Sequence, residues 1–270
     1  MNLLNDGMTK LFDLLLAPFA SSPALTMVVV SVVTSIWALL LFKAVTPQAQ
    51  VTRVRDRLFG HIYEMGLYQD HLRIVGRIQW DLARANIRYL SLTLPALLAL
   101  MVPMVLTLAQ LDSRFTHQPL QPGDETVFTI ALAEVDLSAV RLEVPEGVKI
   151  GAGPVRDRTT NEIAWQLRVE GQISGDLVVY AGERELVRRS VPVGDNLIAL
   201  GESSEQGWLH TLLYPGAPGL PSGSDVIAMT LHLPTRQVAY LGFGLDWLVA
   251  FMLISMAVGL VIKDWLRVSI

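Results

Sequence analysis

The chain has 270 residues, of which 51% are hydrophobic and 17% are charged, a balance that excludes an ordinary soluble enzyme and makes membrane residence the first hypothesis. The formal net charge is −4, so the chain has no overall basic surface for nucleic acid. Cysteine is absent, which excludes disulfides, thiolate catalysis, iron–sulfur clusters and cysteine-type zinc sites.

The first predicted element, residues 1–20, is an amphipathic helix lying on the outer leaflet of a membrane. Its apolar residues recur at helical spacing: Leu4, Met8, Leu11, Phe12, Leu15 and Leu16. Lys10 is its only cation and Asp13 interrupts the apolar stretch, which argues against a secretory signal peptide. A leader without a role of its own is the alternative interpretation.

Three stretches are apolar and long enough to cross a bilayer: residues 25–42, 90–111 and 243–262. The first contains no charge, and as a helix it would be about 27 Å long, close to the hydrocarbon thickness. The third has one acid, Asp246, near its start, where the carboxylate can stay in the headgroup layer. We therefore predict three transmembrane helices.

Residues 45–89 are predicted to form a helical hairpin between the first two spans. Each arm has one apolar face, and the two faces can pack against each other. Arg53, Arg57, Arg73 and Arg77 lie at helical spacing on faces suited to anionic lipid, or to RNA and acidic protein on a ribosome. A solvated face that only sets the orientation in the membrane is the alternative.

The orientation follows from the cations, because Lys and Arg near a span are retained in the cytoplasm. Residues 43–88 contain eight cations and four acids, whereas residues 112–240 contain ten cations and seventeen acids. We therefore expect the N-terminus and residues 112–240 outside, and the hairpin and the tail, residues 263–270, inside. The chain lacks cysteine and N-glycosylation acceptors, which fits a bacterial inner (cytoplasmic) membrane.

Residues 112–240 are predicted to form an extracytoplasmic all-β domain, closed as a small antiparallel sandwich. Residues 163–169 alternate between apolar and polar side chains, and residues 177–180, 186–193 and 226–233 resemble further strands. Turn signals include Gly171. An interfacial segment near Trp208 and Tyr214 is a candidate surface for the membrane or a partner. The fold class is therefore a membrane α-helical protein with an extracytoplasmic β domain.

The sequence contains no recognisable catalytic site. The histidines are spread over both predicted sides of the membrane: His61, His71, His117, His210 and His232. The motifs of serine hydrolases, P-loop proteins, zinc proteases and dinucleotide-binding proteins are absent. No acid or base lies deep in a predicted span, which argues against a pump. We expect no enzyme activity, no cofactor and no metal.

The spans contain hydroxyl, amide and methionine side chains that predict a partly polar groove, if their faces converge. The groove candidates come from all three spans: Ser31, Thr34, Ser35, Thr93, Met104, Thr107, Gln110, Met252, Ser255 and Met256. Small and hydroxylated residues also join spans to each other without any further role, and this is the alternative interpretation.

This order of elements, with Leu-Met-Val-Pro-Met in the second span (residues 100–104), resembles the YidC/Oxa insertase superfamily. The resemblance is one of topology, to the three-span branch of archaeal YidC-like proteins and the third subunit of the ER membrane complex, and covers residues 1–121 and 243–270. Residues 42–110 also resemble an uncharacterised group of bacterial inner-membrane proteins. Two features depart from YidC: no basic residue lies within the bilayer, and the outer domain follows the second span.

The resemblance implies a membrane-protein insertase or chaperone, in which the hairpin captures a hydrophobic client and the groove lowers the cost of moving its polar flank into lipid. The expected partners are then the lipid bilayer, nascent membrane proteins and the ribosome, and no specific nucleic acid. The alternative is a non-catalytic scaffold or assembly subunit, which binds other membrane subunits through its β domain.

Overall fold

The computed structural model describes residues 2–19, 22–68, 72–133, 135–217, 219–240 and 243–268. The chain divides into two compact units, and the boundaries between them fall within three helices. The first unit is Met1–Thr26 with Leu106–Trp247, and the second unit is Met27–Val105 with Leu248–Ile270.

The first unit begins with the predicted amphipathic helix, which is confirmed as a helix, α1 (Asn2–Leu16), followed by the short 3-10 helix η1 (Ala17–Phe19). The predicted ends of this segment, residues 1 and 20, lie outside the described residues. Leu16 is buried, whereas Leu11 and Leu14 are exposed. The helix therefore leaves part of its apolar surface uncovered.

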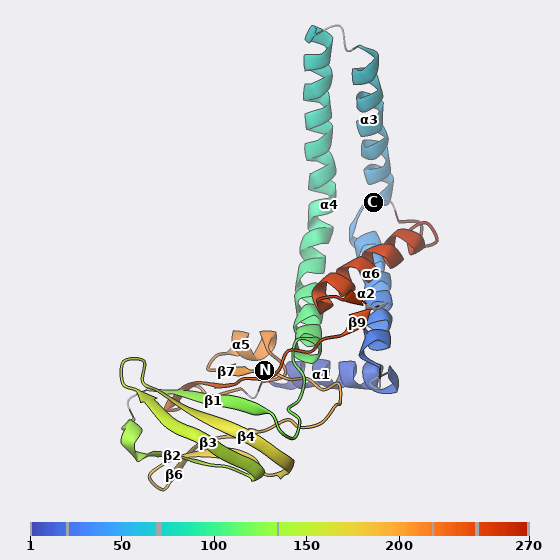
Figure 1. Ribbon diagram of the computed structural model, residues 1–270. Coiled ribbons are helices and arrows are strands. Elements are labelled where there is room, and N and C mark those ends of the chain that lie inside the picture. Colours follow the sequence, from blue (N-terminus) through green and yellow to red (C-terminus); the bar gives the residue numbers. More distant parts are fainter. Residues whose placement is uncertain are drawn as a thin grey trace. The chain divides into compact units, whose positions relative to one another are not determined.

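The β region of the first unit consists of two antiparallel sheets and a short hairpin (Figure 1). The five-stranded sheet has the order β3-β4-β1-β8-β7, and the three-stranded sheet has the order β2-β5-β6. The strands are β1 (Glu125–Leu132), β2 (Val140–Glu143), β3 (Glu146–Asp157), β4 (Glu162–Ser174), β5 (Asp176–Ala181), β6 (Arg184–Ser190), β7 (Ser203–Glu205), β8 (Val226–Leu231), β9 (Ala239–Tyr240) and β10 (Phe243–Gly244).

One hydrophobic core joins the two larger sheets. The alternation predicted for residues 163–169 is confirmed, since Ile163, Trp165, Leu167 and Val169 of β4 are all buried. The rings of Trp165 and Phe128 stack with centroids 6.0 Å apart. The second sheet contributes buried residues to the same core, among them Leu177 and Val179 of β5. The two sheets therefore share one core, which is compatible with the predicted sandwich.

Several predicted boundaries in the β region were wrong. Gly171 lies inside β4 and makes no turn, because the ladder with β3 continues to Ser174. β6 runs from Arg184 to Ser190, and β8 ends at Leu231. Strand β3 lacks a clear alternation because it is an edge strand, mostly exposed, with register shifts against β4. The segment predicted to be interfacial begins with a helix, α5 (Trp208–Leu213), and residue 218 lies outside the described residues.

Among the described residues, two helices are long and apolar enough to cross a membrane: α2 (Pro23–Val45) and α4, whose full extent is Leu72–Phe115. They contain the predicted stretches 25–42 and 90–111. The third predicted stretch forms a shorter helix, α6 (Trp247–Ile262), of 16 residues or about 24 Å. Its predicted start at residue 243 was wrong, because Phe243 pairs with Tyr240 in the β9–β10 hairpin.

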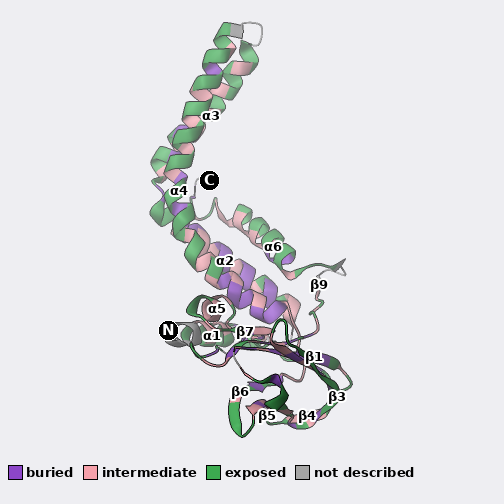
Figure 2. Cartoon of the chain, turned by 90° about the vertical axis from the view of Figure 1, so that its left-hand side faces the viewer, coloured by how far each residue is buried: buried purple, intermediate pink, exposed green. Residues whose placement is uncertain are grey.

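The predicted hairpin is formed by α3 (Gln48–Leu67) and the first part of α4, which lie side by side (Figure 1). Val51 and Val54 of α3 and Ile78 of α4 are buried, as expected for facing apolar stripes. The hairpin and the second span are not separate elements, since α4 is one helix that contains Pro95 and Pro103. Most of the other hairpin side chains are half-buried or exposed (Figure 2).

Candidate functional site: an apolar groove between three helices

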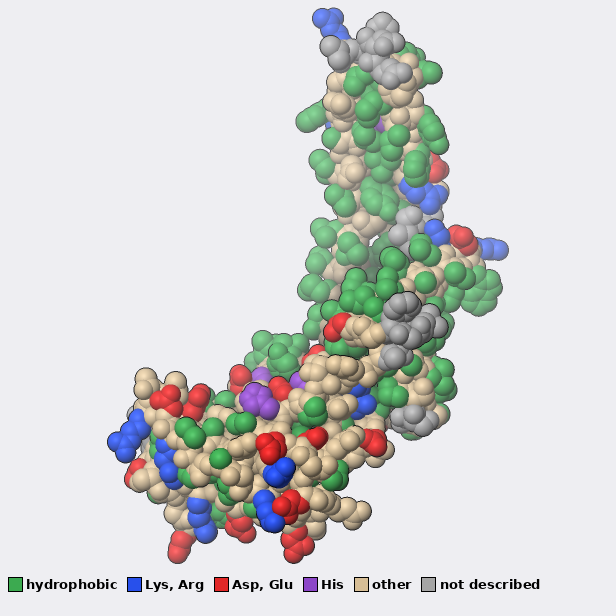
Figure 3. All heavy atoms as spheres, in the orientation of Figure 1, with side chains coloured by type: hydrophobic (Ala, Val, Ile, Leu, Met, Phe, Trp, Pro, Cys, Tyr) green, Lys and Arg blue, Asp and Glu red, His purple; other side chains and the backbone are tan. Residues whose placement is uncertain are grey.

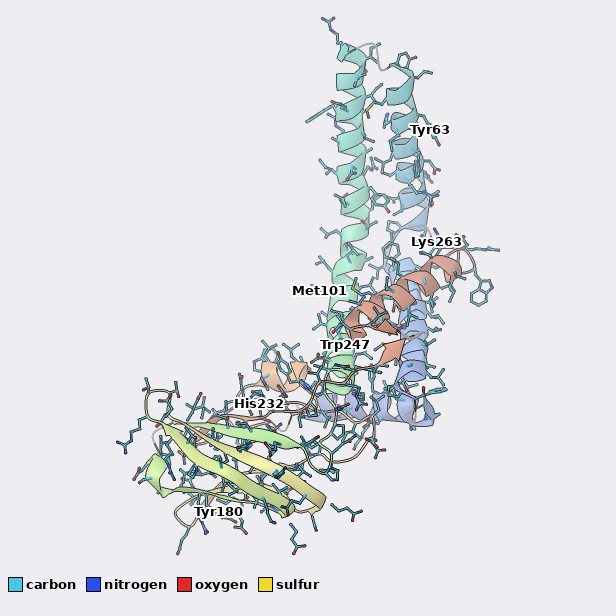
Figure 4. All side chains as sticks on the ribbon, viewed as in Figure 1. Tyr63, Met101, Tyr180, His232, Trp247 and Lys263 are labelled. Atoms are coloured by element: carbon cyan, nitrogen blue, oxygen red, sulfur yellow. The ribbon has the colours of Figure 1, made fainter. Side chains whose placement is uncertain are left out.

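A groove of about 360 Å³ lies between α2, α4 and α6 of the second unit. Its walls include Leu39 and Phe42 from α2, Leu100 from α4 and Phe251 from α6. Hydrophobic side chains predominate on the visible surface of these helices (Figure 3), and Figure 4 labels Trp247 and Lys263 at the two ends of α6. The helices thus enclose a site that suits apolar ligand groups.

A serine hydroxyl connects two walls of the groove. Ser35 Oγ on α2 lies 2.8 Å from the carbonyl oxygen of Ser31 and 2.9 Å from that of Ser255 on α6, and it can donate to either. Ser31 Oγ and Ser255 Oγ are buried and have no hydrogen-bond partner among the described residues. The small serine side chains let α2 and α6 approach closely, which is the usual role of such residues between membrane helices.

The end of the chain packs next to the groove. Lys43 Nζ, at the end of α2, donates to the carbonyl oxygen of Leu266 at 2.7 Å. Val268 is buried in a cluster with Leu39, Phe42 and Ala96. The predicted tail, residues 263–270, is therefore tied to α2 and α4 as far as residue 268, and residues 269 and 270 lie outside the described residues.

The structure brings half of the groove candidates together. Five of them line the groove: Thr34, Ser35, Met104, Ser255 and Met256. Ser31 is buried and Met252 is exposed, and neither lines it. Thr93 also lies outside the lining, and its hydroxyl is 3.2 Å from the carbonyl oxygen of Tyr89 in its own helix.

Thr107 and Gln110 do not line the groove, and both residues belong to the first unit. Gln110 Nε2 donates to Thr9 Oγ1 of α1 at 3.2 Å, so this amide connects two helices. The sequence reasoning also missed the aromatic walls, Phe42 and Phe251. The sequence gives only a weak signal that these residues line a groove, because an aromatic residue in an apolar helix can equally well face lipid.

The four arginines predicted to bind a partner, Arg53, Arg57, Arg73 and Arg77, are all exposed. Within the described part of the chain, none of the four forms an ion pair with an acid. Their charges are therefore available to a partner in solution or at a lipid surface.

Arg114, at the end of α4, is a buried cation that the sequence reasoning missed. Its guanidinium is 1% exposed and lies 2.5 Å from Asp13 Oδ1 of α1 and 2.6 Å from Gln110 Oε1. It also lies over the ring of Phe12, 5.7 Å from the centroid. This arginine therefore holds α1 against the end of α4. No local signal pairs it with Asp13, because the two residues are far apart in the chain.

A second cavity, of about 310 Å³, lies in the first unit near His117, Glu202, Glu205 and His210. Glu202 Oε1 is 3.8 Å from His117 Nδ1 and 3.9 Å from Nδ1 of His232, which Figure 4 labels. In the ranges that the structure describes, no group of three acidic, histidine or cysteine residues is placed to hold a metal ion. His117 and His232 thus lie closer together than the sequence suggested, on either side of Glu202.

Burial lowers the pKa of Arg189, in β6, to about 10, and the charge of Glu202 partly opposes this shift. Its guanidinium donates to the carbonyl oxygens of Gly201, at 2.5 Å, and Met229, at 3.4 Å. These acceptors lie on β8 and on the segment before β7. Arg189 therefore joins the two sheets of the sandwich.

The chain matches no protein-family model, no curated protein and no solved structure. The resemblance to the YidC/Oxa superfamily therefore depends on the order and character of the elements alone.

Proposed function

We propose that this protein is an integral membrane protein that binds hydrophobic segments of other membrane proteins in the groove between α2, α4 and α6, as an insertase or chaperone does. The observation that carries the proposal is the mainly apolar lining of this groove. The lining comes from two helices long and apolar enough to cross a membrane, α2 and α4, and from the shorter apolar helix α6. Its volume of about 360 Å³ is at the lower end of the range of roughly 300–1,000 Å³ for ligand sites. It would receive a few side chains of a docked helix.

Methionine supports a site for varied clients. Met104 and Met256 line the groove, and Met256 is 60% exposed. The unbranched thioether side chain adapts to different apolar shapes, so one surface can pack against unrelated sequences. The hydroxyl of Ser35 is already directed at two carbonyl oxygens, and a client therefore meets mainly apolar contacts here.

The proposed location is a bacterial inner membrane, with the N-terminus and the β region outside and the hairpin and C-terminus inside. The uneven distribution of cations along the chain supports this orientation. Anionic lipid on the cytoplasmic side would attract the exposed arginines of the hairpin, which strengthens the same assignment.

A photocrosslinking amino acid at Met104 or Met256 is expected to capture many unrelated nascent membrane segments in translating membranes. The same amino acid at Val102, which is exposed on α4 and does not line the groove, is the control and should capture several-fold less. Capture of one fixed, stoichiometric protein would instead favour the scaffold function. Capture of lipid alone at all three positions would contradict client binding.

Reversal of the four hairpin charges, Arg53→Glu, Arg57→Glu, Arg73→Glu and Arg77→Glu, is expected to weaken sedimentation with ribosomes or anionic vesicles roughly tenfold or more at low salt. The reason is that each exposed guanidinium is attracted to phosphate. The four Arg→Lys substitutions retain the charge and serve as the matched control. If the reversed protein binds as before in both assays, these arginines only orient the chain in the membrane.

A further inference from the structure

The first unit has an exposed apolar surface formed by two helices that are distant in sequence. α1 and α5 contact each other. Leu11, Leu14 and Leu15 are exposed on α1, and Trp208 and Leu209 are exposed on α5. A cluster of hydrophobic side chains over α5 is visible in Figure 3. Contiguous apolar patches of this kind usually mark an interaction site, because water contact is unfavourable for them.

We propose that this α1–α5 surface lies in the headgroup layer of the lipid leaflet at which α2 begins, and so anchors the β region to the membrane. The proposal rests on the membrane location proposed above. The path of the chain identifies the occupant. η1 ends at Phe19 and α2 begins at Pro23, so at most about 14 Å of extended chain separates α1 from an apolar helix long enough to span a bilayer.

A second connection holds α1 near the same membrane surface as the start of α2. Arg114, at the end of the long apolar helix α4, forms an ion pair with Asp13 and donates to the carbonyl oxygen of Thr9 at 3.3 Å. α1 is therefore attached both where one long apolar helix starts and where the other ends. Since α5 contacts α1, its exposed side chains share that level.

The residue types fit the headgroup layer of a zwitterionic bilayer. Trp208 is 63% exposed, and Tyr214, which follows α5, stacks on His210 with ring centroids 4.6 Å apart. Tryptophan and tyrosine are enriched at this depth because one end of each ring is polar and the body is apolar. α5 itself contains no acid or lysine or arginine. Binding would therefore depend on apolar burial and would not require anionic lipid.

The absence of cysteine allows a direct measurement of depth. Single variants Leu209→Cys and Leu14→Cys are labelled with a nitroxide in the full chain, reconstituted in phosphatidylcholine nanodiscs. Collision with oxygen, which concentrates in lipid, is compared with collision with a water-soluble nickel chelate. Val102→Cys on α4 is the lipid control, and Val155→Cys, 69% exposed on β3, is the water control.

Labels at positions 209 and 14 are expected to favour oxygen over the nickel chelate, as at position 102 and opposite to position 155. A label at 209 with the accessibility of 155 overturns the inference, while lipid exposure at 102 leaves the membrane location intact. A label at 209 shielded from both reagents indicates contact with protein, such as a second copy of the chain, and also overturns it. Water exposure at 102 overturns the membrane location itself.

Discussion

Gly259→Trp is expected to reduce client capture by the groove at least about tenfold while the protein stays folded. Gly259 lines the groove, and a Cβ atom added there meets no other atom within 4 Å. The indole ring would therefore occupy space that a client side chain needs. A tenfold loss corresponds to about 1.4 kcal/mol of binding free energy. Glycine in a helix interior is less favourable than other non-proline residues by up to roughly 1 kcal/mol of helix stability. Its replacement should therefore not weaken α6.

The matched control is Gly60→Trp in α3. Gly60 is also a helical glycine with open space around its Cβ position, but it lies on the hairpin and does not line the groove. Capture is measured as crosslinking yield from a photoreactive group at Met104, and folding is measured by circular dichroism in detergent. Undiminished capture by a folded Gly259→Trp protein would show that clients bind elsewhere.

Asp13→Ala is expected to destabilise the first unit by about 2 kcal/mol, more than Arg114→Met does. Arg114 is 1% exposed, and without Asp13 its charge would remain buried with no counter-charge. Loss of one partner of a fully buried pair costs roughly 3–5 kcal/mol. Asp13 is 57% exposed, so solvent reduces this figure. Arg114→Met removes the buried charge and leaves Asp13 free to be hydrated.

The measurement is the midpoint of thermal unfolding in detergent, where about 2 kcal/mol corresponds to a decrease of roughly 4–8 °C for a unit of this size. The double variant Asp13→Ala, Arg114→Met is expected to be more stable than Asp13→Ala alone. A larger loss for Arg114→Met than for Asp13→Ala would show that packing of the arginine against Phe12, and not the ion pair, stabilises the contact.

Part of the candidate site was predictable from the sequence, because residues three or four positions apart lie on the same face of a helix. Thr34 and Ser35, one turn from Ala38, and the pair Ser255 and Met256 share faces that do line the groove. The same reasoning failed for Gln110, since periodicity identifies a face of the helix but not the level along it. α4 has 44 residues, and its far end belongs to the other unit.

Among the strands, too, some were predictable from the sequence and others were not. Apolar and polar side chains alternate strictly over residues 163–169, because one face of β4 is turned to the core and the other is not. The burial of these residues follows the same alternation. β3 could not be recognised, because its register shifts and its place at the sheet edge remove that contrast. Phe243 is apolar and precedes an apolar helix, yet backbone pairing with Tyr240 places it in a hairpin.

By itself, the sequence determined the local properties of this protein: which segments are apolar enough for helices of membrane-crossing length, where the β region lies and which arginines are exposed on the hairpin. These depend on composition and on periods of two or 3.6 residues, which neighbours in the chain decide. Only the tertiary structure decided that Asp13 pairs with Arg114, that Ser35 reaches Ser255 and that the tail packs on α2. Each of these contacts joins residues that are far apart in the chain, and no local energy term selects such a pair before the helices pack.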